Sequence, residues 1–75
     1  MNGRKTLRKV ASHRVEDEDG NVWVQAVVSL ENGRVVSVEH FEDELPMTEW
    51  LCGTIELKHD ETGGYSAWWN KIRLE

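Results

Sequence analysis

Hydrophobic and polar residues alternate along most of this 75-residue chain, and turn-forming residues separate the alternating runs. A period of two is typical of β-strands, and helical periodicity is absent. We therefore expect an all-β fold of about five strands, at residues 7–17, 21–30, 34–41, 53–59 and 65–74.

Two hairpin turns are predicted in the first half. Asn32-Gly33 and Asp19-Gly20 both suit two-residue type I′ turns, whose central residues need positive φ. Counting outward from these turns gives an antiparallel meander in which Leu30 faces Val35, Val28 faces Ser37 and Val15 faces Val24. One face of this meander collects the predicted core: Ala11, His13, Val15, Val22, Val24, Ala26, Val28, Leu30, Val35 and Phe41.

The second half is expected to complete a single domain over residues 1–75. Residues 42–50 hold an acidic cluster and the only proline, which predicts a turn or a short helical connector, with Thr48 as a cap. We expect Trp50 and Leu51 to plug the open end of the sheet, and the C-terminal hairpin to curl over one face. The result would be a partly open barrel or sandwich, with residues 1–6 as a frayed arm.

Apolar side chains are also predicted on the second face of the meander, where an antiparallel sheet is normally polar. In the last strand, alternation places Trp68, Ile72 and Leu74 on one face and Trp69 on the other, between two cations that could stack on it. A chain of this size buries only about 60% of the surface of its unfolded form, so these groups need a cover. The predicted interaction surface comprises Trp23, Val36, Val38, Trp69, Lys71 and Arg73.

The spacing of the candidate ligand residues does not predict a metal or cofactor site. The candidate ligands His13, His40, His59 and Cys52 do not form the close pairs typical of zinc sites. The "EDEDGN" stretch fails as a calcium loop, because Ala26 stands where the glutamate would be needed. We expect neither a metal nor a cofactor.

Catalysis is not predicted either. Cys52 has no basic neighbour to activate it, and Ser12 and His13 point to opposite faces of one strand, so they cannot act as a dyad. Phosphate-binding glycine loops are absent from the sequence. We therefore expect a protein that is not an enzyme.

Charge disfavours a general nucleic-acid surface, because the net charge is −5 and the pI is about 5.1. Five of the nine basic residues nevertheless lie near the N-terminus: Arg4, Lys5, Arg8, Lys9 and Arg14. A frayed or edge-protecting segment explains them, and a weak nucleic-acid contact is a lesser alternative. The chain shows no secretory signal and no apolar run of about 20 residues, so we expect a cytoplasmic protein without membrane contact.

The stretches "DGNVWVQAVVSLENGRVVSVEHF", "EDELP" and "TEWLCGTIEL" together resemble a group of short uncharacterised proteins of gut anaerobic bacteria. The resemblance covers roughly residues 10 to 58 and depends mainly on Thr48, Glu49, Trp50, Leu51, Gly53 and Ile55. It implies a compact β fold and a bacterial origin, and it implies no activity.

These patterns lead to one functional hypothesis and two alternatives. The hypothesis is a non-enzymatic module that binds a protein partner or a second copy of itself, as a homodimer. Because the chain holds four tryptophans, a small-molecule or glycan site on surface tryptophans is the first alternative. The nucleic-acid contact of the basic arm is the second.

Overall fold

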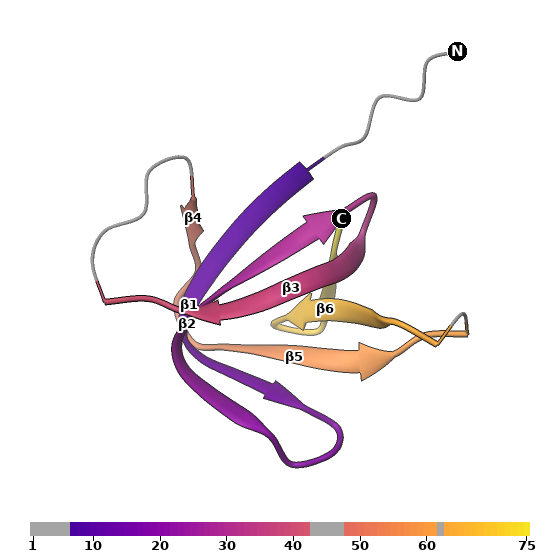
Figure 1. Cartoon of the computed structure of the whole chain (residues 1–75), viewed down its shortest axis with the longest axis horizontal. Helices are drawn as coiled ribbons and strands as arrows, with labels where there is room; N and C mark the ends of the chain where they lie inside the picture. Colours follow the sequence, from indigo (N-terminus) through magenta and orange to yellow (C-terminus); the bar gives the residue numbers. More distant parts are fainter. Residues whose placement is uncertain (1–6, 43–47, 62) are drawn as a thin grey trace.

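The chain folds into one open, curved β-sheet in a computed structural model that describes residues 7–42, 48–61 and 63–75 (Figure 1). The predicted all-β fold is confirmed, and the described residues contain no helix. The strands are β1 Leu7–Asp17, β2 Val22–Glu31, β3 Arg34–His40, β4 Glu49–Trp50, β5 Thr54–His59, β6 Tyr65–Trp69 and β7 Ile72–Leu74. Of the predicted connector at residues 42–50, residues 43–47 lie outside the described residues, as does the predicted arm at 1–6. The end of the connector is corrected, because Glu49 and Trp50 form the strand β4 rather than a turn or helical segment.

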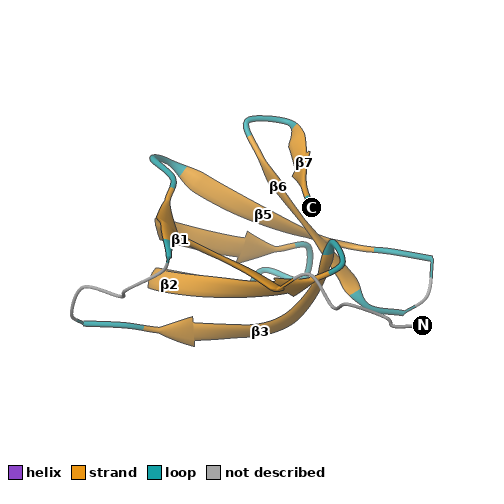
Figure 2. Cartoon of the chain, turned by 90° about the horizontal axis from the view of Figure 1, so that it is seen from above, coloured by secondary structure: helices purple, strands orange, loops and turns teal. Residues whose placement is uncertain are grey.

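Two antiparallel meanders form this sheet, and a parallel pairing joins them. The strand order is β3-β2-β1-β5-β6-β7, and β4 also pairs with β1. Both β4 and β5 run parallel to β1, a mixed pairing that the sequence pattern did not predict. The sheet curls so that β3 approaches β6, although the two are not paired (Figure 2). The sheet is therefore curled and open, and it does not close into a barrel.

A kink in β1 and β2 interrupts the alternation of buried and exposed side chains. The ladder pairs Ser12 with Ala26 and Arg14 with Val24 but skips the residues between them. In that gap Gln25 has φ 52°, in the left-handed region. The alternation consequently reverses at the kink: Ser12 and Ala26 point inward before it, and Val15 points inward after it.

The predicted core face is corrected, because His13, Val22 and Val24 are exposed. Ala11 is buried on the outer face against β4, and Phe41 contacts Trp50 rather than the core. The kink is one reason. The other is the first turn, in which the amide of Asp17 donates to the carbonyl of Asn21 at 3.0 Å. The loop is thus one residue longer than a type I′ turn, so Arg14 rather than Val15 faces Val24.

The second turn forms at Asn32-Gly33 as predicted, with positive φ at both residues. A bulge follows in β3, because Leu30 pairs with Val35 while Ser29 pairs with Ser37. Val28 therefore faces Val38 rather than Ser37, and Val36 is the extra residue.

The predicted last strand is in fact a hairpin. Asn70 and Lys71 have φ 51° and 66° and form its turn, which separates β6 from β7. The reversal places Trp69 with Ile72 and Leu74 on the inner face, and it leaves Trp68 on the outer face beside Lys58, whose Nζ lies 4.9 Å from the ring centroid. The cation–π contact among the described residues therefore joins Lys58 to Trp68, and it is not the predicted stacking of Lys71 or Arg73 on Trp69.

The core lies inside the curl and draws on both meanders. Partly buried rings pack against it, including Trp23 and Trp69. Its buried members are Val10, Val15, Ala26, Val28, Leu30, Ile55, Leu57, Ala67 and Leu74.

Candidate functional site

The six residues of the predicted interaction surface do not share one face. Three of them are partly buried and pack against the core: Trp23, Val38 and Trp69. The other three are exposed: Val36 in the β3 bulge, Lys71 in the last turn and Arg73 in β7. A dimer contact through these residues stays a prediction.

A different aromatic group lies at the surface beside the kink. Trp50 was expected to plug the sheet, but its exposed fraction is 47%. Its ring centroid lies 4.8 Å from that of His13 and 5.9 Å from that of Phe41, and both rings stand nearly perpendicular to it. We call these three residues the kink surface, together with Val24, which is 64% exposed and pairs with Arg14 at the kink.

The register of β4 explains why Trp50 faces outward. Trp50 is the ladder partner of Ala11, which lies on the outer face before the kink and is only 2% exposed. The amide of Leu51 donates to the carbonyl of Ala11 at 2.8 Å, and the register then gains one residue before Arg14 pairs with Thr54. Gly53, with φ 102°, allows this bulge opposite the kink.

An ion pair lies next to this surface on the inner side of the sheet. Arg8 Nε donates to Glu49 Oε2 at 2.5 Å and Nη2 donates to Oε1 at 2.9 Å, while Nη1 donates to the carbonyl of Glu75 at 3.0 Å. The hydrogen bond from Arg8 lowers the pKa of Glu49, and the same bond raises the pKa of Arg8. Of the basic residues proposed for nucleic-acid contact, Arg8 is thus engaged within the chain, and Lys9 is exposed.

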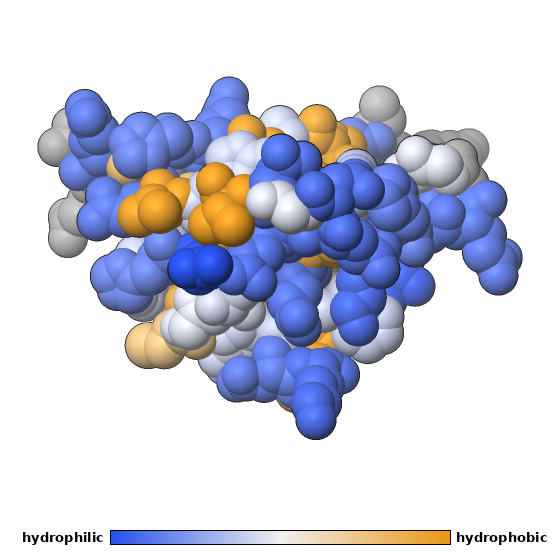
Figure 3. Space-filling view, turned by 90° about the horizontal axis from the view of Figure 1, so that it is seen from below, coloured by the Kyte–Doolittle hydropathy of each residue, from blue (hydrophilic) through white to orange (hydrophobic). Residues whose placement is uncertain are grey.

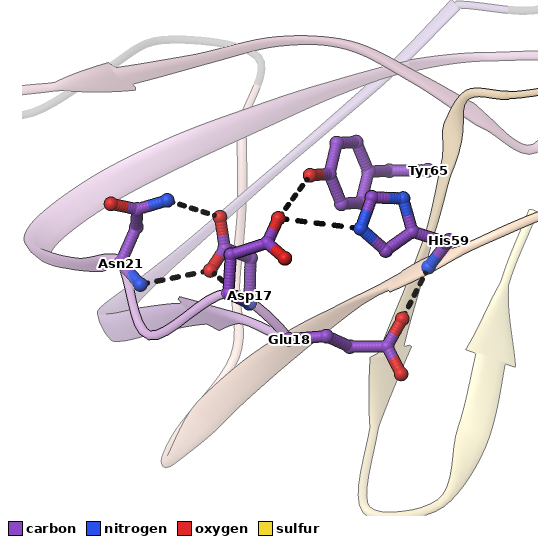
Figure 4. A network of polar contacts seen from close by, with 6 residues as sticks. Asp17, Glu18, Asn21, His59 and Tyr65 are labelled. Atoms are coloured by element: carbon purple, nitrogen blue, oxygen red, sulfur yellow. Dashed lines mark hydrogen bonds and ion pairs between the residues drawn. The ribbon is translucent and has the colours of Figure 1, made fainter.

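A polar network joins the β1–β2 turn to the far ends of β5 and β6 (Figure 4). Glu18 Oε1 accepts the amide of His59 at 2.7 Å. Asp19 Oδ2 accepts the Tyr65 hydroxyl at 3.0 Å and lies 3.3 Å from His59 Nε2. The His59 and Tyr65 ring centroids are 4.5 Å apart. Sequence reasoning missed this network because its two halves lie about 40 residues apart.

The hydrogen bonds of this network shift two pKa values in directions that stabilise the folded turn and that do not activate a nucleophile. The hydrogen bond to Asp19 raises the pKa of Tyr65, so formation of the nucleophilic phenolate is disfavoured. The side-chain amide of Asn21 lowers the pKa of Asp17, whose Oδ1 also accepts two backbone amides of the turn. Within the described ranges, no three His, Cys, Asp or Glu side chains come together as metal ligands.

The other candidate groups for chemistry have structural partners. Ser12 is fully buried, and its Oγ donates to the carbonyl of Arg14 at 2.6 Å. His40 Nδ1 donates to the carbonyl of Val24 at 2.9 Å. Cys52 is exposed, and its carbonyl accepts the indole N–H of Trp69 at 2.6 Å.

An open groove separates the β2–β3 turn from the β5–β6 turn. Arg34 and Arg73 line it together with the carboxylates of Asp60 and Glu61, and Arg34 Nε lies 3.9 Å from Asp60 Oδ2. These charges balance, so the groove has no net charge that would select an anion.

Comparison with known proteins finds no relative: no protein family model, no curated protein and no solved structure matches this chain. Among the described residues, none forms a helix long and apolar enough to cross a membrane. The kink surface, the polar network and the groove therefore have to be judged by their own geometry.

Proposed function

We propose that this chain is a non-enzymatic protein-interaction module whose partner contacts the kink surface. The observation that carries the proposal is the half-exposed indole of Trp50, held between the perpendicular rings of His13 and Phe41. Tryptophan is among the residues that contribute most binding energy at interfaces. An indole already fixed by its neighbours loses little conformational freedom when a partner binds.

The surroundings of the kink surface suit an interface with an apolar centre and a polar rim. Val24 adds an exposed apolar side chain, and its ladder partner Arg14 forms an ion pair with Glu16 nearby. The face seen in Figure 3 is mostly hydrophilic and carries its apolar side chains in small groups.

The partner is either a second copy or a different protein, and light scattering at micromolar concentration separates the two. A homodimer that Trp50→Ala converts to monomer identifies self-association through the kink surface. A wild-type monomer points to a different protein. The net charge of −5 works against self-association at low salt.

Site-specific photocrosslinking tests the proposal directly. A benzophenone side chain replaces Val24 in one variant and Ile72 in another, in cells that naturally make the chain. Ile72 is a matched control, because it is 61% exposed but lies on β7, away from the kink surface. We expect a discrete adduct from position 24 that Trp50→Ala abolishes. Adducts that are absent, or identical from both positions, would contradict the proposal.

Trp50→Ala must leave the fold intact for this test to be informative. Because the side chain is half exposed, we expect a loss of about 1–2 kcal/mol in the free energy of unfolding. Ile55→Ala, at a fully buried position, should cost about 2–5 kcal/mol. Urea denaturation measures both, and equal losses would show that Trp50 is a core residue.

A small-molecule or glycan site on Trp50 is the second candidate function. An exposed indole face can stack on a sugar or a base. Oligosaccharides or nucleotides would then quench tryptophan fluorescence in the wild type and not in Trp50→Ala. An unchanged wild-type spectrum argues against this candidate.

A further inference from the structure

One side of β2 lacks a neighbouring strand over its first residues. The β2–β3 ladder ends where Ala26 pairs with His40, and one further bond follows, from the Phe41 amide to the carbonyl of Gln25 at 3.0 Å. Residues 22–24 therefore pair with β1 on one side and with no described strand on the other.

The backbone groups that face this open side can be counted from the ladder. In an antiparallel pair, alternate residues direct their N–H and C=O groups to opposite sides. Because Asp17 bonds to Asn21 at the turn, Trp23 bonds toward β1, and Val22 and Val24 point away from it. The carbonyl of Val24 already accepts from His40 Nδ1. Among the described residues, the N–H and C=O of Val22 and the N–H of Val24 are therefore left for a partner.

The side chains at this edge are apolar as well as exposed. Val22 is 47% exposed and Val24 is 64% exposed, while Trp23 between them packs against the core. Sheet edges are usually protected by charged residues, prolines or bulges. Residues 22–24 include no charged residue or proline, and they pair regularly with β1 up to the irregular Gln25 that follows them.

We propose that the edge of β2 at residues 22–24 takes up an extended segment of a protein partner as an added strand. The inference rests on the proposed function, and it adds that the protein partner binds as an extended segment. An extended backbone supplies acceptors for the N–H groups of Val22 and Val24 and a donor for the C=O of Val22, and its alternate side chains cover the two valines.

Charge defines the partner further. The chain is acidic at both ends of this edge: Glu18 and Asp19 precede it in the turn, where they also bond to His59 and Tyr65, and the exposed Glu42 follows the last β3 contact. The segment therefore carries apolar residues at alternate positions and basic residues at its flanks. A second copy fits less well, because symmetric antiparallel pairing about Trp23 would bring Glu18 and Asp19 of one copy toward Glu42 of the other.

Amide hydrogen exchange tests the premise on the free protein. We expect the amides of Val22 and Val24 to exchange as fast as those of a turn, and the amide of Trp23 to be protected. Slow exchange at Val22 and Val24 would show that the edge is already covered and would overturn the proposal.

Selection from a phage-displayed library of random peptides tests the partner. We expect enrichment of sequences with alternating apolar residues and basic flanks, and protection of the Val22 and Val24 amides on binding. Val24→Pro removes the N–H and should weaken binding about tenfold or more, as the loss of a backbone hydrogen bond implies. Val24→Thr keeps the N–H and the β-branched shape, so it should bind like the wild type.

The outcomes separate the strand addition from the proposed function. Enriched peptides that bind both Val24 variants equally, or that leave both amides unprotected, overturn the added strand while the Trp50 anchor can still stand. Peptides that respond to Val24→Pro and not to Trp50→Ala support the strand and leave Trp50 without a role. A dimer that Val24→Pro dissociates would make a second copy the occupant and overturn the peptide partner.

Discussion

A single carboxylate, Asp19, joins two distant parts of the sheet. Its Oδ2 accepts the Tyr65 hydroxyl and lies beside His59, so the β1–β2 turn is tied to the end of the β5–β6 hairpin. The tyrosine hydroxyl donates only while it is protonated. The contact therefore depends on pH in a direction that can be worked out.

We expect Tyr65 to titrate above its ordinary pKa of about 10, because the bond to Asp19 favours the protonated form. The folded-state pKa is raised, so the contribution to stability is fully present below the unfolded pKa and is lost as pH rises through the folded pKa. Tyr65 is the only tyrosine, so phenolate absorbance reports it alone. Asp19→Asn should lower the pKa of Tyr65, and Glu61→Gln should leave it unchanged. Equal titration curves for the wild type and both variants would contradict the contact between Tyr65 and Asp19.

At the scale of elements, turns and bulges decide which side chains face the core. The Asn32-Gly33 turn was predictable, because two residues with the required positive φ are adjacent in the sequence. The first turn was not, because Asp17 stabilises a longer loop through its own side chain, which accepts the amides of Asp19 and Asn21. A difference of one residue in a loop moves every later side chain of the strand to the other face.

The Asn70-Lys71 turn is the element that a substitution can improve. Lys71 has φ 66°, which costs a residue with a Cβ roughly 1–2 kcal/mol. Lys71→Gly removes this strain and creates the favoured Asn-Gly pair. After the entropy cost of glycine, we expect stability to rise by about 0.5–1 kcal/mol in urea denaturation.

Arg73→Gly is the control for this turn, because it places glycine within β7, where it should destabilise. Destabilisation by Lys71→Gly as well would show that the two strands do not meet in this turn.

At the scale of the whole molecule, contacts distant in sequence hold the curled sheet together. Arg8 connects β1 to β4 through Glu49 and to the C-terminal residue through the carbonyl of Glu75. The parallel pairing of β1 with β5 joins the two meanders into one core. The ion pair between Arg8 and Glu49 makes part of the folding stability sensitive to acid.

We expect Arg8→Ala to lower stability by no more than about 1 kcal/mol at neutral pH, because the pair is partly exposed. The pKa of Glu49 is lowered in the folded state, so this stabilisation is present above the unfolded pKa and is lost as pH falls through the folded pKa. The difference between wild type and Arg8→Ala should therefore shrink in acid. Urea denaturation across acidic and neutral pH measures it, and a difference that does not change with pH would contradict the ion pair.

The kink surface shows where sequence reasoning reached its limit. Alternating residues determine the β class, and Asn32-Gly33 determines its hairpin, because both signals act between neighbours in the chain. The exposure of Trp50 and Val24 depends on a left-handed Gln25 and on the register of β4 against β1. The kink arises in the ladder between β1 and β2, and the β4 register arises from pairing of Ala11 with Trp50, about 40 positions apart. Local alternation carries no information about either pairing. The sequence thus specifies a curled all-β sheet, and the long-range pairing places the surface that a partner would meet.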